Sequence, residues 1–285
     1  RDRFTLDIGG KYVVNTFYEV VGGCGANVAV GLSRRGFQCV LWSEIGKDSL
    51  TKLIRERLEK EGVGCSLLEH KEKNINISSI LLSQTGERTI INHRSHNAQM
   101  VLTDTIRERV RQCNFLYLGN MPEMPITERV ELVKLVKLVG GKVAVNLGVK
   151  DCRRGQTQLS ELLSQTDYLI VNRYELSDIV GIAPNELLLH ERSYHSTLGL
   201  EPDSILVITD GALGSYAHTK DKVYFQKIVP VEKVVDTTGA GDAFSVGFIA
   251  GQLSGKSIQE SLLMGATSSV SVIQKIGAQE GLLFS

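Results

Sequence analysis

Short apolar segments alternate with helical segments along most of this chain, and this alternation constrains its fold more than any other feature. Residues 25–36 combine small and apolar side chains and end at Gly36, so we expect a tightly packed helix there. Short strands that are apolar throughout are typical of a parallel sheet with helices on both faces. The chain is therefore expected to be an α/β protein. The pattern predicts strands at residues 39–42, 65–68, 115–118, 142–146, 167–171, 205–209 and 215–218, and further helices at 48–61, 103–112, 126–139, 157–164, 240–253 and 257–276.

Two segments interrupt this alternation. Residues 11–21 and 74–92 contain β-branched and aromatic side chains in alternation, and residues 84–87 (Gln-Thr-Gly-Glu) are typical of a hairpin turn. They are predicted to form a small separate β-sheet, called the lid below. No repeat, low-complexity stretch or linker divides the chain, so residues 1–285 are expected to form a single domain that carries this lid.

The charge balance and the cysteines exclude several classes of protein. Lysine plus arginine equals aspartate plus glutamate at 32 each, so no net charge favours nucleic acid. Five scattered cysteines without a C-x-x-C pair fit reduced thiols better than a disulfide framework or a zinc site. The longest apolar runs are too short to span a bilayer. We expect a cytoplasmic protein that binds neither nucleic acid nor a membrane.

A run of small residues, hydroxyls and aspartates at residues 236–244 (Asp-Thr-Thr-Gly-Ala-Gly-Asp-Ala-Phe) comes directly before an apolar helix. Gly239 and Gly241 let the backbone approach an anion closely, and the free N–H groups of a helix start favour negative charge. The motif predicts a phosphate cradle with Asp242 held at its rim as a base. For the aspartate alone, an ordinary residue in the first helical turn is an equally good interpretation.

A second glycine motif lies between the first lid segment and the first predicted helix. Residues 22–27 read Gly-Gly-Cys-Gly-Ala-Asn. Ligands of open α/β sheets bind beside such loops, where Gly22 and Gly23 would admit a substrate to the backbone and Asn27 would offer a donor and an acceptor to a polyol. Taken alone, the motif could also be a glycine-rich turn in which Asn27 caps its helix.

Taken together, the two motifs resemble those of the PfkB, or ribokinase, family of sugar and nucleoside kinases, and the resemblance covers nearly the whole chain. Residues 22–46 match the spacing of the family's first motif, and residues 236–247 match its D-T-x-G-A-G-D motif. Residues 172–175 resemble the N-x-x-E element, and residues 209–214 resemble the T-x-G-x-x-G turn. The resemblance implies a ribokinase-like three-layer α/β/α fold with a mostly parallel central sheet plus a small β-sheet lid.

The resemblance also implies how the reaction would proceed. Asp242 would act as the general base at the acceptor hydroxyl, and the N–H groups of Gly239, Ala240 and Gly241 would form the anion hole for the transferring phosphoryl group. The acceptor would lie against Asp242 and the second glycine motif. The substrate-binding residues implied there are Gly22, Gly23 and Asn27.

The remaining elements would bind the nucleotide and its metal. Asn172 and Glu175 would organise Mg²⁺, with Glu175 acting through water, although a carboxylate in a first helical turn has an ordinary structural explanation as well. Residues 277–278 and the last helix would lie against the adenine. Thr209, Gly211 and Gly214, together with Gly239 and Gly241, would flank the ribose and phosphates of ATP, although the 209–214 turn alone could be a simple strand connection.

A monovalent cation such as K⁺ is a further expectation from the family. Asp236 and Thr238 match the residues that hold it, but Glu280-Gly281 stand where ribokinase itself has a serine. The sequence therefore allows this site without requiring it.

Several other candidates have simpler explanations. Residues 250–257 resemble a Walker A loop, but the spacing is wrong and a helix precedes them, so Gly255 is better explained as a helix stop. Arg94 and His96, in or just after the predicted hairpin strand, are expected to be solvated polar residues rather than catalytic groups. Cys24 is expected to be a small space-filling side chain rather than a reactive thiol.

The family's first strand normally carries an aspartate that binds substrate hydroxyls. Asp7 lies only shortly before Gly22 and belongs more naturally to the loop that enters the lid. We therefore expect that strand and its aspartate to lie outside this sequence.

The resulting hypothesis is an ATP-dependent kinase that phosphorylates a hydroxyl of a sugar or sugar acid, and we expect this hydroxyl to be that of a hydroxymethyl group. A nucleoside kinase is the nearest alternative, because Tyr12, Phe17 and Tyr18 could contact a base. A catalytically inactive ligand-binding homologue is the third. The open edges of the lid also favour a homodimer.

Overall fold

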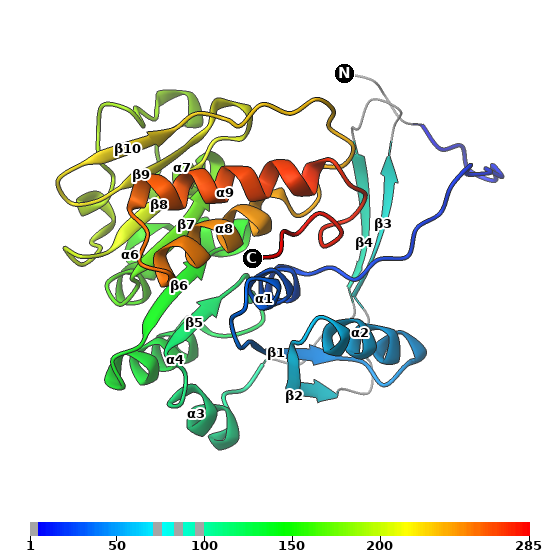
Figure 1. Ribbon diagram of the computed structural model, residues 1–285, viewed down its shortest axis with the longest axis horizontal. Coiled ribbons are helices and arrows are strands. Elements are labelled where there is room, and N and C mark those ends of the chain that lie inside the picture. The colour runs from blue at the N-terminus through cyan, green and yellow to red at the C-terminus, as the bar shows by residue number, and fades with distance from the viewer. Residues whose placement is uncertain (1–4, 71–75, 83–87, 95–99) are drawn as a thin grey trace.

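The computed structural model describes residues 5–70, 76–82, 88–94 and 100–285 (Figure 1). Its largest sheet has six strands in the order β10-β9-β8-β7-β6-β5. Neighbouring pairs from β5 to β8 are parallel, and β9 pairs antiparallel with both β8 and β10. This confirms the predicted mostly parallel central sheet. The strands are β5 (Phe115–Leu118), β6 (Lys142–Asn146), β7 (Tyr168–Asn172), β8 (Ile205–Thr209), β9 (Ser215–His218) and β10 (Val223–Gln226).

Helices cover both faces of this sheet, because its strands are apolar on both sides. Val143 and Val145 of β6 join one core, whereas Ala144 between them joins the other. This arrangement confirms the three-layer α/β/α prediction. The first core includes side chains from α3 (Asp104–Val110), α4 (Ile126–Leu138), α5 (Val149–Cys152), α6 (Gly155–Leu163) and α7 (Arg173–Val180), and the second from α1 (Cys24–Arg34), α2 (Ser49–Lys60), α8 (Ala240–Leu253) and α9 (Ile258–Ile273).

Two smaller sheets complete the architecture. β1 (Val40–Ile45) and β2 (Gly64–His70) form a parallel pair connected through α2. β3 (Asn76–Leu82) and β4 (Arg88–Arg94) form an antiparallel pair that stands apart from the six-stranded sheet (Figure 1). This pair confirms the hairpin expected within residues 74–92, whereas its turn at residues 84–87 lies outside the described residues.

The lid strand predicted for residues 11–21 is wrong, because these residues have no strand conformation. Their side chains are almost all exposed, and Phe17 retains 83% of its accessible surface. Alternation of apolar and polar residues indicates that a segment can form a strand, but a strand also needs an edge with which to pair. No such pairing reaches residues 11–21 in the described part of the chain.

The helix that carries the phosphate motif lies deep in the protein. Its residues from Ala243 to Gly251 are all buried. Gly31 of α1 allows close approach, since a Cβ atom there would lie 2.5 Å from Val246 of α8. The two helices are thereby packed closely, and a hydrogen bond between Asn27 and Asp242 joins their first turns, and so the two glycine motifs. No helix in the described ranges combines the length and the apolar character needed to cross a membrane.

Candidate active site

A cavity of about 180 Å³ lies where the parallel strands end and α8 begins. Asn146, Asn172 and Thr209 close β6, β7 and β8 respectively, and parallel strands place their carboxyl ends at one edge of the sheet. Gly241 and Asp242 of α8 supply another part of the wall. Elements that are far apart in sequence are thereby brought to one polar site, lined by Asn146, Ile170, Val171, Asn172, Glu175, Thr209, Gly241 and Asp242.

Asp242 lies in the first turn of α8, where the sequence predicted it. Gly239 is the N-cap residue with φ of 77°, a left-handed conformation that glycine adopts readily. A Cβ atom on Gly239 would also lie only 2.4 Å from the Ala278 side chain. The N–H of Ala240 donates a long hydrogen bond of 3.3 Å to the Thr237 carbonyl oxygen. The tight turn at Gly239 thus leads directly into the first turn of α8, whose N–H groups have no acceptor within the helix.

Asn27 joins the two glycine motifs directly. Its Nδ2 atom donates to Oδ2 of Asp242 at 2.7 Å, although the two residues are 215 positions apart. Burial raises the pKa of the Asp242 carboxyl, and the hydrogen bond from Asn27, together with the neighbouring Cys24 thiol, partly offsets that rise. Asn27 is itself 3% exposed. The side chain is therefore a fixed partner of Asp242 rather than a simple helix cap.

Gly22 and Gly23 come directly before α1. Gly23 is the N-cap residue of that helix, and its carbonyl oxygen accepts from the N–H of Asn27 at 2.8 Å. Cβ atoms built on either glycine would meet nothing within 4 Å. Neither glycine lines the cavity beside Asp242. The loop therefore leaves open space beside the helix that carries Asn27.

Cys24 and Tyr117 lie beside Asp242. The Cys24 Sγ atom is 3.4 Å from Tyr117 Oη and donates to Asn146 Oδ1 at 3.7 Å. Burial, together with the negative charge of Asp242, raises the pKa of the Cys24 thiol to about 12. The thiol is therefore protonated at neutral pH, which argues against a reactive thiolate and agrees with the expected space-filling role.

Asn172 and Glu175 form a capping box at the start of α7. The Asn172 side chain accepts from the N–H of Glu175 at 2.9 Å, and Glu175 Oε2 accepts from the N–H of Asn172 at 2.8 Å. Burial raises the pKa of Glu175 to about 7, against the lowering effect of the Asn172 hydrogen bonds. Asn172 and Glu175 therefore cap the start of α7, and both also line the cavity.

These residues are compatible with Mg²⁺. No group of three or more acidic, His or Cys ligands occurs among the described residues. Mg²⁺ needs few protein ligands when phosphates and water supply the others. Glu175 Oε1 has no protein hydrogen bond within the described ranges, and it belongs to a desolvated carboxyl at the cavity, so it could receive a hydrated cation.

The turn after β8 is held by an ion pair. Arg173 binds both carboxylate oxygens of Asp210, at 2.7 and 2.5 Å. Thr209 lines the cavity, whereas Gly211 and Gly214 do not. A Cβ atom on Gly214 would lie 2.5 Å from the Gln226 carbonyl oxygen, so this glycine also has a packing role. Gly211 has open space around it.

Asp236 links the phosphate motif to the segment after α9. Its Oδ1 atom accepts from the N–H of Thr238 at 2.9 Å, and Oδ2 accepts from the N–H of Gly277 at 3.0 Å. Asp236 is 2% exposed, and the Thr238 hydroxyl is buried without a hydrogen-bond partner in the part of the chain described. The carboxylate thus tethers two loops whatever else it binds.

Gln279 lies behind the cavity wall, at a position that no sequence motif indicates. Its Nε2 atom donates to Oδ1 of Asn27 at 3.1 Å, so it stands directly behind the partner of Asp242. The two residues are 252 positions apart, and no motif spacing indicates this contact.

Two of the remaining candidates can be placed. Residues 250–257 run from the end of α8 through Gly255, with φ of 71°, to the Ser257 cap of α9, which confirms the helix stop. Arg94 ends β4, and His96 lies outside the described residues.

Comparison with known proteins identifies relatives over nearly the full chain. A model of the pfkB family carbohydrate kinases matches residues 7–283. The 2-dehydro-3-deoxygluconokinase of Bacillus subtilis is 27% identical, with 98% of this chain and 88% of that protein covered. The ribokinase of Arabidopsis thaliana is 29% identical, with 92% of this chain and 69% of that protein covered.

Solved structures show the same fold. The structure of Arabidopsis thaliana ribokinase complexed with ribose and ATP has a TM-score of 0.79 and 26% identity, and covers 96% of this chain and 88% of that one. Ribokinase from Cryptococcus neoformans in complex with ADP has a TM-score of 0.75 and 25% identity, with 99% and 91% covered.

Proposed function

This chain belongs to the pfkB family of carbohydrate kinases, and we propose that it transfers the terminal phosphoryl group of ATP to a hydroxymethyl oxygen of a sugar or sugar acid. The observation that carries this proposal is the position of Asp242. It lies on the cavity wall at the start of α8 and is held by Asn27 from the other glycine motif. One carboxylate thus meets the loop proposed for the acceptor and the helix start proposed for the phosphate.

In this proposal Asp242 accepts the proton of the acceptor hydroxyl as its oxygen attacks phosphorus. The N–H groups of Gly239, Ala240 and Gly241 stabilise the negative charge on the transferring phosphoryl group, because the positive end of the α8 dipole lies there. The burial that raises the pKa of Asp242 also increases its basicity. Phosphoryl transfer needs positioning and charge neutralisation more than covalent help, and these groups supply both.

The acceptor is proposed to bind between Asn27 and the open space beside Gly22 and Gly23. Sugars are favoured over nucleosides because the relatives with the higher identities are named for sugars or sugar acids. Structures of an adenosine kinase and a nucleoside kinase share the fold at 21% and 20% identity. Likeness at that level carries no argument about the acceptor.

The nucleotide is proposed to lie along Thr209, Gly211, Gly214 and the 239–241 turn. The ATP and ADP complexes of the ribokinase relatives support this choice of nucleotide. When bound, Mg²⁺ would neutralise phosphate charge beside Asn172 and Glu175. We propose that a monovalent cation such as K⁺ would bind beside the buried Thr238 hydroxyl and the buried Asp236.

We also propose a homodimer formed through the lid. The described lid strands expose four large apolar side chains, and a two-stranded sheet with open edges is unstable alone. Light scattering over a concentration series tests this, and a monomer at every concentration would contradict it. The exposed apolar residues are Ile77, Leu82, Ile90 and Ile91.

The kinase proposal is tested by a screen of sugars, sugar acids and nucleosides, with product phosphate ester detected directly. Replacement of Asp242 by asparagine keeps the shape of the site and removes the base. We expect turnover to fall at least a hundredfold while ATP binding persists, since general base catalysis contributes about 10²–10⁴-fold. Equal phosphorylation by the wild type and Asp242→Asn would refute the assigned base. Preferential turnover of a nucleoside would favour the alternative acceptor class.

A further inference from the structure

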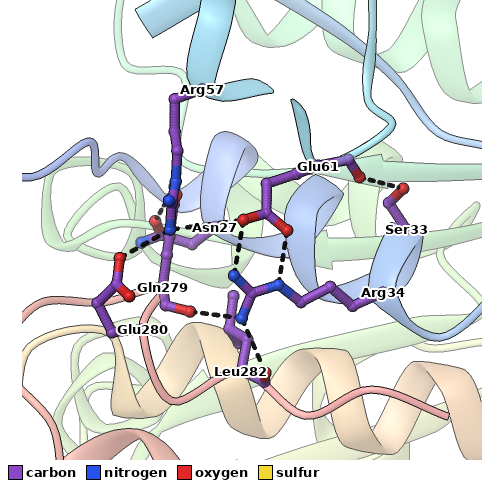
Figure 2. Close-up of polar contacts among 8 residues, drawn as sticks. All are labelled: Asn27, Ser33, Arg34, Arg57, Glu61, Gln279, Glu280 and Leu282. Atoms are coloured by element: carbon purple, nitrogen blue, oxygen red, sulfur yellow. Dashed lines mark hydrogen bonds and ion pairs between the residues drawn. The ribbon is translucent and has the colours of Figure 1, made fainter. Parts of the chain in front are cut away.

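A chain of polar contacts runs behind Asp242 and leads away from the cavity. Asn27 Nδ2 donates to the Asp242 carboxylate, and Asn27 Oδ1 accepts from Gln279 Nε2. Figure 2 shows how Gln279 then meets Arg34, whose Nη1 atom donates to the Gln279 carbonyl oxygen at 2.9 Å. Asn27 and Gln279 are each 3% exposed, so water cannot readily replace either partner.

The Asp242 carboxylate determines which atoms donate and which accept in this series of hydrogen bonds. An ionised carboxylate only accepts hydrogen bonds, so Asn27 must present its NH₂ group to Asp242. The two ends of an amide have nearly the same shape, so packing alone does not select that orientation. Asn27 Oδ1 then faces Gln279, which must donate. A reversed Asn27 amide would place an oxygen against the carboxylate and an NH₂ group against the Gln279 donor.

The other end of the Gln279 amide supports this interpretation. Gln279 Oε1 is buried without a hydrogen-bond partner in the part of the chain that the structure describes. Leaving a buried acceptor without a partner costs free energy. Because Oε1 has no such partner, the orientation of the Gln279 amide is not explained by a contact of its oxygen. The described hydrogen bond that fixes its orientation is the one donated to Asn27.

Arg34 explains how Gln279 is held in place. Its guanidinium binds both Glu61 oxygens at 2.7 Å and donates through Nη1 to the Gln279 and Leu282 carbonyl oxygens, each at 2.9 Å (Figure 2). Asn27 and Arg34 are seven positions apart on α1, which places them on one face of the helix two turns apart. One face of α1 therefore holds Gln279 twice, by its side chain through Asn27 and by its backbone through Arg34.

We propose that Gln279 is a positioning residue for the base: by donating to Asn27 Oδ1 it holds the Asn27 amide with its NH₂ group toward Asp242. Its kinetic consequence rests on the proposed function, because only then does Asp242 act on a hydroxyl. Its consequence for the Asp242 carboxyl requires no substrate and holds in the free protein.

The surroundings of Asp242 determine how its titration is interpreted. Cys24 of α1 and Tyr117 of β5 face it, and burial raises the pKa of both, so both are neutral near pH 7. Glu175 of α7 lines the same cavity and has a pKa of about 7. Its titration must be resolved from that of Asp242, which assignment of each side-chain carboxyl carbon achieves.

The test uses the full chain with Gln279→Met, which keeps length and removes the donor, and Gln279→Glu, whose carboxylate favours the reversed Asn27 amide. Without a correctly oriented Asn27 donor the charged form of Asp242 loses the hydrogen bond from Asn27. We expect the Asp242 pKa, followed by carbon NMR of the free protein, to rise by about one pH unit in Gln279→Met and further in Gln279→Glu. The acidic limb of kcat against pH should move equally, with KM for ATP unchanged.

Two controls separate positioning from general damage. Gln274→Met makes the same substitution at an exposed glutamine just after α9, whose side chain donates to the Val270 carbonyl oxygen, and should leave the Asp242 pKa unchanged. In an Asn27→Leu background, Gln279→Met should change the Asp242 pKa no further, because the amide that it orients is gone.

An unchanged Asp242 pKa in Gln279→Met would overturn the proposal, as would shifts that simply add in the Asn27→Leu background. If Gln279→Met does not fold, Gln279→Glu decides by the same titration. If no acceptor is phosphorylated by the wild type while the carboxyl shifts appear as expected, the proposed function fails and the positioning role stands.

Discussion

At the scale of single residues, Glu175 carries two conflicting demands. Its place in the capping box stabilises the start of α7, whereas burial raises its pKa from 4.5 to about 7. Between those pH values the folded protein holds a proton that the unfolded chain has already lost. Folding stability therefore falls as the pH rises through this window. A charge that the fold disfavours is typical of a group kept for a ligand.

Glu175→Gln should separate the two demands. A glutamine oxygen can still accept the Asn172 hydrogen bond, but it carries no charge. We expect the variant to be more stable than the wild type at pH 8, by up to about 3 kcal/mol, and indistinguishable from it near pH 4. Urea unfolding at the two pH values measures this. A loss of stability at pH 8 would show that the carboxylate itself stabilises the fold.

The same carboxyl should couple metal binding to protons. Because Glu175 must lose its proton to attract a cation, binding of Mg²⁺ with ADP should release a proton and tighten as the pH rises through about 7. Calorimetry in buffers of different ionisation enthalpy counts the protons released. Glu175→Gln should release fewer protons and lose this pH dependence, and proton release equal to that of the wild type would exclude Glu175 as the group responsible.

Single-residue predictions from the sequence succeeded where chemistry and chain position coincide. Asp242 was predicted at a helix start and lies there, because small residues before an apolar run define that start locally. Gln279 could not be found, because its role depends on how the segment after α9 packs against α1. A lone glutamine carries no local signal of burial.

At the scale of elements, α8 combines a reactive end with a tightly packed body. Gly241 faces the cavity and a Cβ atom there would meet nothing within 4 Å, whereas at Gly247 it would lie 2.3 Å from the Met264 carbonyl oxygen of α9. Neither glycine has a positive φ, so alanine suits the backbone at both positions. The two sites form a matched pair for separating function from packing.

Gly241→Ala should lower kcat at least tenfold while keeping or raising Tm, because the methyl group enters the cavity and alanine favours a helix by about 0.5–1 kcal/mol. Gly247→Ala should do the opposite. It should lose about 1–3 kcal/mol of stability through overpacking and keep its activity per folded molecule. Thermal unfolding and initial rates measure both, and a destabilised Gly241→Ala would refute the open space inferred beside it.

Element predictions held where periodicity and burial agree. The helix expected at residues 48–61 is observed as Ser49–Lys60, because a charged amphipathic pattern and a glycine stop define it locally. The strand expected at residues 11–21 is absent, since alternation cannot supply a partner edge. β10 was not predicted, because Val223–Gln226 is short and only partly buried.

At the scale of the whole molecule, the site depends on contacts that no single segment encodes. Asp242, Asn27 and Gln279 come from α8, α1 and the segment after α9. The two glycine motifs and the family resemblance predicted that Asp242 and Asn27 share a site. Distances, protonation and the supporting contacts required the packed structure, because they arise from how α8 and the segment after α9 fit against α1.

Stability of the whole fold should depend on pH through His218, which is fully buried in β9. Its Nδ1 atom accepts from the N–H of Tyr194 at 3.2 Å, and its Nε2 atom lies 3.0 Å from the Leu189 carbonyl oxygen, to which Nε2–H donates. A second proton would have to sit on Nδ1, where it would point at the Tyr194 N–H and remove the acceptor of that hydrogen bond. Burial accordingly lowers the pKa of His218 from 6.5 to about 4.

Between about pH 6.5 and 4 the unfolded chain therefore takes up a proton at His218 that the folded protein excludes, so stability falls as the pH falls. The loss approaches about 3 kcal/mol at pH 4. His218→Gln cannot be protonated and should show a flatter profile, even if it is less stable at pH 7. His93→Gln, at an exposed position of β4, should retain the wild-type slope. Urea unfolding from pH 7 to 4 measures these slopes, and a wild-type slope in His218→Gln would assign the acid sensitivity to another group.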